Sequence, residues 1–340
     1  MSNAKDWPSL EVVIPVYNED DVLELLISRL SSVFAAQNLC EQRVRSVGFI
    51  MVDDGSRDRT AEIICRHIEA GFPAVLYRLS RNFGHQNALS AGLDYAEADL
   101  VAIIDADLQD PPELIYDMLK KWREGYDVIY GQRQRRKEGL PKRVGYWLFY
   151  RMLSVLSEIP MPFDSGDFCL LDRRVVNALR DLPEKLRFVR GLRAWVGFRQ
   201  AAFPYERATR QAGRPKYTWR KLYRLATDGI ASSSVRPLKI AQLTSFCFFC
   251  LSLAFLLLLA LSFLFWRANG VSPYFLLAYA LLALGNSLQA LCIYVLGAYV
   301  GRSYLEVKKR PSYLITEVIG RRPDDAKNVP RDERQERNDG

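Results

Sequence analysis

Short hydrophobic runs alternate with helical patterns over the first third of the chain. The runs at 10–15, 47–52, 74–79 and 100–104 are nearly uninterrupted, which is typical of strands buried on both faces of a parallel sheet. Between them, hydrophobic residues recur at helical spacing. The predicted apolar face of the first helix consists of Val22, Leu25, Leu26, Leu30 and Val33. This pattern predicts an α/β fold with a mostly parallel sheet.

Two much longer hydrophobic runs follow, at about 243–266 and 273–300. Neither contains a charged residue, and each exceeds the roughly 20 residues that a helix needs to cross a bilayer. Buried core helices are the alternative, but two such runs joined by a short turn favour a transmembrane hairpin. The predicted parts of the chain are a catalytic-type domain at 1–235, the hairpin at 236–302 and a tail at 303–340.

Positive charge sets the predicted orientation. The chain has 47 Lys and Arg against 39 Asp and Glu, a formal net charge of +8. Basic residues flank both outer ends of the hairpin, whereas the connecting turn carries only Arg267, so we expect both termini in the cytoplasm. With no nucleic-acid module in the sequence, the charge indicates anionic lipid rather than nucleic acid. Six scattered cysteines favour free thiols in a reducing compartment.

Two further segments have the pattern of helices that lie on a membrane surface. Hydrophobic residues recur near helical spacing over about 141–159, behind a basic run at 133–137, and a second such helix is expected at about 219–233. A buried core helix is the alternative for the first segment. Arg133, in the basic run, is a candidate for binding an anionic headgroup or a phosphate.

A polar cluster follows each of the four predicted strands. Ligands of parallel α/β sheets bind beyond the carboxyl ends of the strands, so we expect the clusters to meet at one edge. The clusters are Pro15, Tyr17, Asn18 and Glu19; Asp53 and Asp54; Arg81, Gly84 and His85; and Asp105, Asp107 and Gln109. An Asp-Asp-Gly turn alone is a common structural feature, but four clusters after four strands favour a binding site.

The chemistry of these clusters suits a nucleotide and a metal. Asp105 and Asp107, spaced one residue apart, can face one hard cation together with the amide oxygen of Gln109. Asp53 and Asp54 can accept hydrogen bonds from a base or a ribose. Three more residues could contact a nucleotide. The ring of Tyr17 could stack on the base. Arg81 supplies a permanent cation for the diphosphate, and Gly84 lets the backbone approach the diphosphate closely.

Four motifs resemble those of family 2 glycosyltransferases with the GT-A fold: IPVYNE at 14–19, VDDGS at 52–56, RNFG at 81–84 and DADLQDPPE at 105–113. Within that family the chain is similar, from about 10 to 310, to the polyprenyl-phosphate glycosyltransferases. These include dolichol-phosphate mannose and glucose synthases and bacterial undecaprenyl-phosphate glucosyltransferases. The resemblance implies a nucleotide-sugar donor, Mg²⁺ or Mn²⁺, and a polyprenyl phosphate acceptor in the membrane.

The resemblance also implies roles for individual residues. Asp107 and Gln109 match the metal ligands, with Asp105 beside the metal. The implied nucleotide-binding residues are Pro15, Tyr17, Asn18, Glu19, Asp53, Asp54, Arg81, Gly84, Asp105, Ala106 and Asp107. Many relatives have Lys after the glycine of the third motif, whereas this chain has His85, which removes a permanent positive charge.

The segment 164–168 and the loop 206–217 complete the implied site. Asp167, Asp164 and Asp105 are the catalytic candidates, either as a base or as positioning groups. A phosphate monoester has its second pKa near about 6, so the acceptor is largely a dianion and has little proton to lose. Together with Arg133, the implied contacts for the diphosphate and the acceptor phosphate are Arg207, Arg210, Lys216 and Tyr217.

The expected reaction is an inverting transfer that gives a polyprenyl-phosphate β-linked sugar. The RGLxxWxGF run at 190–198 looks more like the glucosyl-type relatives, which favours UDP-glucose over UDP-GlcNAc, another UDP-sugar or GDP-mannose. In that run, Trp195 either shapes the sugar site or packs against other hydrophobic side chains of the domain. Expected partners are a separate flippase and a downstream glycosyltransferase, and long charge-free hairpins can also pack into homo-oligomers. The alternative of another class is an inactive membrane scaffold or flippase partner.

Overall fold

The computed structural model describes residues 7–134, 165–184, 187–206, 242–254, 257 and 273–320. The described residues fall into two compact units, an α/β unit that contains all the described strands and a unit that contains the apolar helices. The predicted surface helices at 141–159 and 219–233 lie outside the described residues.

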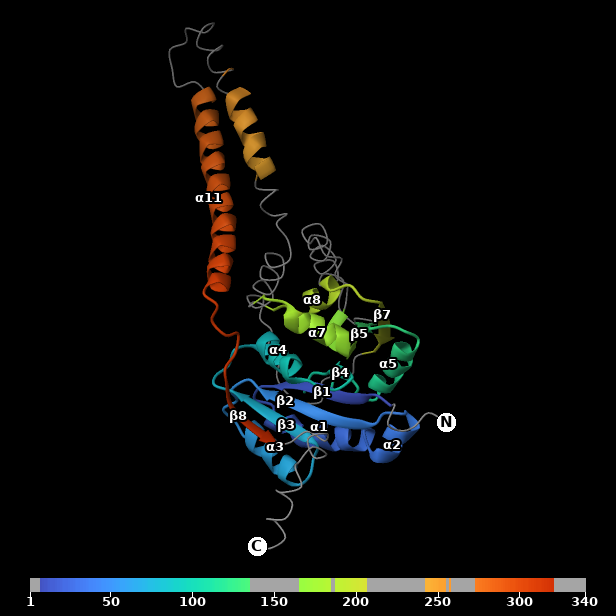
Figure 1. Cartoon of the computed structure of the whole chain (residues 1–340). Helices are drawn as coiled ribbons and strands as arrows, with labels where there is room; N and C mark the ends of the chain where they lie inside the picture. The colour runs from blue at the N-terminus through green and yellow to red at the C-terminus, as the bar shows by residue number, and fades with distance from the viewer. Residues whose placement is uncertain are drawn as a thin grey trace, which may run out of the picture. The chain divides into compact units, whose positions relative to one another are not determined.

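The α/β unit is built on one eight-stranded sheet in the order β7-β5-β6-β4-β1-β2-β3-β8 (Figure 1). The strands are β1 (Ser9–Val16), β2 (Ser46–Asp53), β3 (Ala74–Leu79), β4 (Leu100–Ile103), β5 (Val128–Arg133), β6 (Ser165–Asp172), β7 (Gln200–Tyr205) and β8 (Ile315–Gly320). The helices of this unit are α1 (Asp20–Val33), α2 (Ala36–Glu41), α3 (Thr60–Glu69), α4 (His85–Tyr95), α5 (Leu114–Arg123), α7 (Arg173–Asp181) and α8 (Val189–Trp195).

The four strands predicted from hydrophobic runs are β1 to β4, and they pair in parallel at the centre of the sheet. The flanks are mixed: β5 and β7 are parallel, while β6 runs antiparallel to both β4 and β5, and β8 runs antiparallel to β3. The α/β prediction is confirmed, with three antiparallel pairings that the hydrophobic pattern did not indicate.

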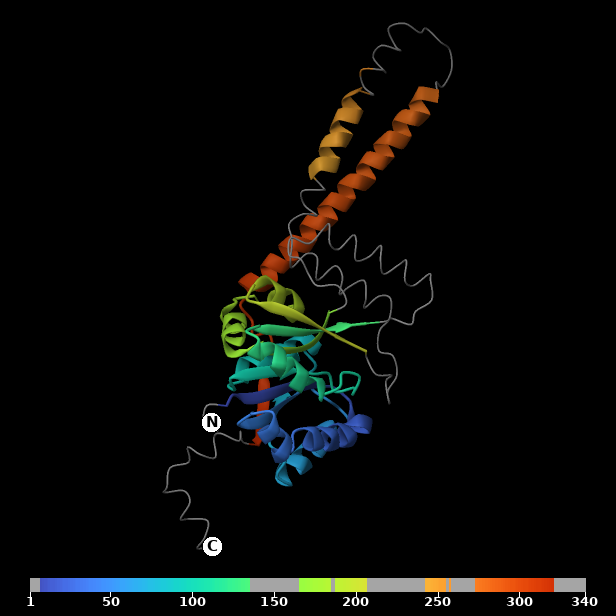
Figure 2. The same cartoon turned by 90° about the vertical axis from the view of Figure 1, so that its right-hand side faces the viewer.

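Helices cover both faces of the sheet (Figures 1 and 2). Side chains of a strand alternate between faces, so Val12 and Ile14 of β1 join the core formed with α1, α3 and α5, whereas Val13 joins the core formed with α4, α7 and α8. The predicted apolar face of α1 is wrong at one position. Leu25 is 50% exposed, and the buried face instead includes Leu23.

Helix α4 packs closely on the central strand. A Cβ at Gly92 of α4 would lie 2.3 Å from Val13 Cγ1 of β1, so this position has no room for a side chain. The close approach fixes the axis of α4 against the sheet. It thereby fixes the amino end of α4, where His85 and Gln86 lie, near the strand ends.

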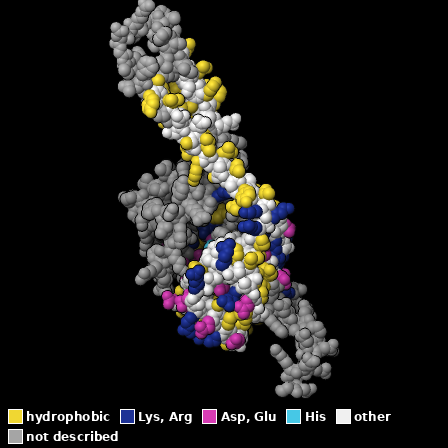
Figure 3. Space-filling view, turned by 90° about the vertical axis from the view of Figure 1, so that its left-hand side faces the viewer, with side chains coloured by type: hydrophobic (Ala, Val, Ile, Leu, Met, Phe, Trp, Pro, Cys, Tyr) yellow, Lys and Arg dark blue, Asp and Glu magenta, His cyan; other side chains and the backbone are white. Residues whose placement is uncertain are grey.

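In the second unit, helix α11 (Pro273–Val307) contains one segment long and apolar enough to cross a membrane, Leu277–Val307. In Figure 3 yellow side chains gather on the apolar helices, and blue and magenta side chains gather on the α/β unit. Of the first predicted span, only the shorter helix Gln242–Ala254 and residue 257 are described. The two-span hairpin therefore stays a prediction.

Strand β8 lies in the segment that the sequence analysis treated as a tail. After α11 the chain adds this strand to the edge of the sheet, with Val318 opposite Tyr77 of β3. Two contacts hold the approach to β8: Ser80 N donates to Leu314 O at 2.9 Å, and Tyr313 OH donates to Asp94 at 2.9 Å. The α/β unit thus includes residues from both sides of the apolar helices.

Candidate active site

The predicted polar clusters meet at one edge of the sheet. Strands β1 to β4 are parallel, so their carboxyl ends lie together, as expected. Strand β6 runs antiparallel to β4, with Cys169 opposite Ile103. The amino end of β6, with Asp167, therefore reaches the same edge as Asp105.

The second and third motifs are tied together through Asp54. Its carboxylate accepts hydrogen bonds from the backbone N–H groups of Phe83 at 2.7 Å and Gly84 at 2.9 Å. Burial raises the pKa of Asp54, and the two N–H groups oppose that rise. Gly84 has φ of 98°, a conformation that favours glycine. Asp54 is therefore engaged with the loop rather than open to a ribose.

Asp53 is different, because one of its oxygens is available to a ligand. Oδ1 accepts a hydrogen bond from Ser56 N at 2.9 Å. Oδ2 is buried and has no hydrogen-bond partner among the described residues, and Arg78 Nε lies 3.6 Å from it. A buried acceptor without a partner costs free energy, so this oxygen suits an N–H donor from a bound molecule.

The first motif is held against the second. The backbone N–H of Asn18 donates to Ser56 Oγ at 2.9 Å, and Asn18 Oδ1 accepts from Arg57 N at 2.9 Å. The N–H of Glu19 donates to Thr60 Oγ1 at 3.0 Å. Pro15 and Tyr17 lie at and just beyond the end of β1, whereas Arg81 is exposed, with its guanidinium 4.1 Å from the ring centre of Phe83.

The acidic motif after β4 forms a tight turn. Leu108 has φ of 57°, and Gln109 N donates to Asp107 Oδ1 at 3.2 Å. Partial burial raises the pKa of Asp105, and the negative charges of Asp167, Asp110 and Asp107 add to that rise against the opposing effect of His85. Ala106 is buried between the two aspartates. Concentrated negative charge on oxygen donors fits a divalent cation.

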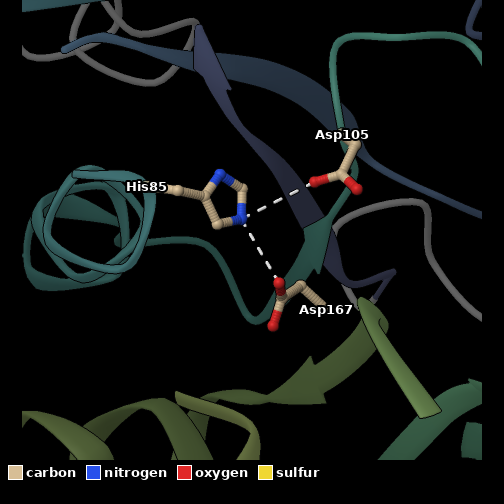
Figure 4. A group of neighbouring side chains, drawn as sticks. All are labelled: His85, Asp105 and Asp167. Atoms are coloured by element: carbon tan, nitrogen blue, oxygen red, sulfur yellow. Dashed lines mark hydrogen bonds and ion pairs between the residues drawn. The ribbon is translucent and has the colours of Figure 1, made fainter. Parts of the chain in front are cut away.

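His85 lies between two carboxylates (Figure 4). Its Nε2 is 3.2 Å from Asp167 Oδ2 and 3.7 Å from Asp105 Oδ1. Desolvation alone would lower the pKa of His85, but the hydrogen bond and charge of Asp167, with Asp105, raise it overall. The residue that replaces the expected Lys therefore occupies the centre of the acidic cluster, which the sequence analysis undervalued.

Arg190 and Gln86 were missed by the sequence analysis. Arg190 makes a two-point contact with Asp167, Nε to Oδ1 at 2.7 Å and Nη2 to Oδ2 at 2.8 Å. Gln86 Nε2 donates to the same Oδ2 at 3.4 Å. Burial alone would raise the pKa of Asp167, but Arg190 and then His85 hold it well below its usual range. The contacting side chains come from α4, β6 and α8.

Arg133 also reaches this edge, because β5 runs antiparallel to β6 with Gln132 opposite Ser165. A Cβ at Gly166 would lie 3.0 Å from Arg133 Nη2. Near it, Tyr205 OH donates to Asp110 Oδ1 at 2.5 Å. Trp195, by contrast, is 57% exposed and does not pack in the core. The remaining predicted site residues lie outside the described residues: Asp164, Arg207, Arg210, Lys216 and Tyr217.

Comparison with known proteins gives a family match and relatives that align over nearly the whole chain. The model of glycosyl transferase family 2 matches residues 11–180. A glycosyltransferase of Synechocystis sp. is 42% identical over 312 residues, 92% of this chain and 96% of the relative. The glycosyltransferase YkcC of Bacillus subtilis is 40% identical, covering 91% and 94%.

A third relative has a more specific name. The SfII prophage-derived bactoprenol glucosyl transferase of Shigella flexneri is 36% identical over 310 residues, 90% of this chain and 97% of the relative. The match at 11–180 covers all four strand-end motifs, all of β6 and most of α7. The chain is an α/β enzyme of the GT-A type and belongs to glycosyl transferase family 2.

Proposed function

We propose that this glycosyltransferase transfers glucose from UDP-glucose to a polyprenyl phosphate, with inversion, at the cytoplasmic face of a membrane. One observation carries the proposal: the chain aligns over nearly its full length, apolar helices included, with a bactoprenol glucosyl transferase. The nucleotide-type and acidic clusters assembled at one sheet edge supply the chemistry such a reaction needs.

The nucleoside would bind beside Asp53. Its buried Oδ2 is an acceptor for the imide N–H of uracil. Tyr17 directly follows Val16, which lies opposite Asp53 in the pairing of β1 with β2, so the Tyr17 ring would stack on the base. Asp54 would act indirectly, because its two oxygens hold the loop at Phe83 and Gly84. This differs from the role that the family resemblance implies, in which Asp54 contacts the ribose.

Asp105, Asp107 and Gln109 would hold a divalent metal, Mg²⁺ or Mn²⁺. When bound there, the metal offsets negative charge on the diphosphate leaving group. The acidic turn itself orients these oxygens, through Leu108 in the left-handed region and the hydrogen bond from Gln109 N to Asp107. Asp105 and Asp164 are the proposed carboxylates nearest the reacting sugar.

The acceptor phosphate would attack the anomeric carbon directly. Its dianion forms the new C–O bond while the bond to the nucleoside diphosphate breaks, and a single displacement inverts the configuration. Because the second phosphate pKa is about 6, no strong base is required. The proposed phosphate contacts are Arg133, Arg207, Arg210, Lys216 and Tyr217, whose positive charges and hydroxyl would offset repulsion between the two phosphate groups.

The membrane part of the proposal places the enzyme beside its lipid. Helix α11 supplies one segment able to span a bilayer, and we propose that 243–266 supplies the other, so that both termini are cytoplasmic. Surface helices at 141–159 and 219–233 would hold the domain at the interface. A separate flippase would then move the product, for use by a downstream glycosyltransferase.

A donor screen tests this function. Membranes containing the protein are incubated with undecaprenyl phosphate and radiolabelled UDP-glucose, UDP-GlcNAc or GDP-mannose, with and without EDTA. We expect metal-dependent label in the lipid extract from UDP-glucose. Preference for another nucleotide sugar would overturn the assigned sugar. Absence of transfer from every donor would favour the inactive scaffold.

A further inference from the structure

The carboxylate of Asp167 is almost completely occupied by protein donors. Oδ1 accepts from Arg190 Nε, and Oδ2 lies within hydrogen-bond distance of Arg190 Nη2, His85 Nε2 and Gln86 Nε2. A carboxylate offers about four lone-pair sites, and four donor contacts nearly fill them. Asp167 therefore has little capacity left to receive a proton from a substrate.

The donors come from the amino ends of two helices that face β6. His85 and Gln86 begin α4, and Arg190 is the second residue of α8. The two ends are tied directly, because Val189 N donates to Gln86 Oε1 at 2.9 Å. The Asp167 side chain thus lies in a clamp whose two sides are joined to each other.

Arg190 is the one arginine of its segment that serves this clamp. Arg187 pairs with Asp94 at 2.7 Å, and Arg193 donates to Gly166 O at 3.4 Å. The Asp167 side chain is only 2% exposed, so its charge needs a compensating cation. A bidentate guanidinium also fixes the plane of the carboxylate, which a single-point donor does not.

A fixed carboxylate fixes the imidazole that it contacts. His85 Nε2 is directed at Asp167 and Asp105, and the other ring nitrogen, Nδ1, points away from both carboxylates (Figure 4). The His85 side chain is 44% exposed, so its ring is open to a bound molecule. The ring orientation therefore depends on Asp167, and that of Asp167 depends on Arg190.

We infer that Arg190 is a positioning residue for sugar transfer: through Asp167 it holds the imidazole of His85 beside Asp105 at the reaction site. In this arrangement Asp167 orients His85 instead of acting as a base. The expected effect on kcat rests on the proposed function. Its geometric part, the control of the His85 ring by Arg190, is independent of the substrate.

Kinetics of Arg190→Gln test the consequence, with Arg190→Lys as the conservative variant. We expect Arg190→Gln to lower kcat by about 10- to 100-fold, the range found for groups that orient a functional side chain. The Kd for UDP should stay within about threefold, and Arg190→Lys should be intermediate because it keeps the charge but not the fork. Millimolar guanidinium should restore kcat to Arg190→Ala in a saturable manner.

Arg187→Gln is the matched control. It removes a partly buried ion pair three residues earlier, Arg187 with Asp94, whose side chains are 15% and 26% exposed and which does not touch Asp167. We expect it to lower the melting temperature but to preserve kcat. Wild-type kcat in Arg190→Gln, or an equal loss in both glutamine variants without guanidinium rescue, would overturn the inference.

The two histidines provide a readout that does not depend on activity. The chain contains only His67 and His85, so histidine-specific ¹⁵N labelling of the full-length protein gives two sets of ring signals. We expect Arg190→Gln to shift the His85 signals and leave those of His67 in place, and Arg187→Gln to shift neither. Unchanged His85 signals in Arg190→Gln would contradict the inference, whereas wild-type protein without transferase activity would contradict only the proposed function.

Discussion

Asp53 and Asp54 follow one another at the carboxyl end of β2, and Asp167 lies near the amino end of β6, yet their partners give the three carboxylates different capacities. Two backbone N–H groups occupy Asp54, Arg190 and His85 occupy Asp167, and Asp53 keeps a buried oxygen without a hydrogen-bond partner among the described residues. Only Asp53 is therefore arranged to accept a donor from a nucleotide. From the sequence, Asp53 and Asp54 are both expected to bind the nucleotide, and Asp167 is expected to act as a base or a positioning group.

Asp54→Asn should weaken donor binding indirectly. The Asn side chain has one oxygen acceptor, and its NH₂ group would face the second backbone N–H, of Phe83 or Gly84. That N–H would lose its acceptor, at a cost of about 1–3 kcal/mol. We expect a lower melting temperature and a higher KM for the nucleotide sugar. Asp58→Asn is the control, since Asp58 also accepts from two backbone N–H groups, at Thr60 and Asp20. An equal rise in KM for both variants would contradict this role of Asp54.

Gly55→Ala should misplace the second motif. Gly55 has φ of 71°, and a Cβ there would lie 2.6 Å from the backbone carbon of Arg81. Gly71 has φ of 96° with nothing within 4 Å, so Gly71→Ala carries the conformational strain without the clash. We expect Gly55→Ala to lose UDP binding measured by calorimetry and Gly71→Ala to lose only about 1 kcal/mol of stability. Normal UDP binding by Gly55→Ala would show that the loop can shift.

Sequence reasoning at this scale identified residues that follow strands and missed their distant partners. Asp53, Asp105 and Asp107 stand out because each follows a hydrophobic run. Arg187, Arg190 and Arg193 have equivalent spacing on one segment, and no local pattern indicates which of them reaches Asp167. That choice depends on how α8 packs against β6.

At the scale of elements, the central strands were predictable and the outer ones were not. Strands β1 to β4 are buried on both faces, which produces continuous hydrophobic runs. Strand β8 lies at the sheet edge and has no fully buried position, so its six residues form no such run. Its partner β3 is more than 200 residues away in sequence. A pairing between segments so far apart produces no pattern in the sequence of either strand.

Removing β8 should destabilise the α/β unit. A chain ending at residue 310 exposes the edge of β3 and loses the hydrogen bond between Tyr313 and Asp94, whereas a chain ending at Gly320 keeps both. Each kcal/mol lost lowers the melting temperature by about 2–4 °C for a domain of this size. We expect a fall of about 5–10 °C for the shorter chain only. Equal melting temperatures would show that β8 contributes no stability.

At the scale of the whole molecule, the proposed topology makes the two sides of the membrane distinguishable. Cys40 is exposed on the α/β unit, and Ala268 lies in the sequence between the two proposed spans. In intact cells a membrane-impermeant maleimide should label Ala268→Cys but not Cys40, each in a chain otherwise free of cysteine. Permeabilisation should make Cys40 reactive. Labelling of Cys40 in intact cells would reverse the orientation.

The central claim is that the strand-end acidic turn catalyses transfer of a sugar to a membrane lipid. Its most direct test is metal-dependent transfer from UDP-glucose to undecaprenyl phosphate by Asp107→Ala, compared with wild type and with Asp117→Ala on the exposed face of α5. Losing a proposed metal ligand should remove several kcal/mol of transition-state stabilisation, so we predict a fall of at least about 100-fold, with the protein still resistant to carbonate extraction from membranes. Transfer by Asp107→Ala at the rate of Asp117→Ala would contradict the claim.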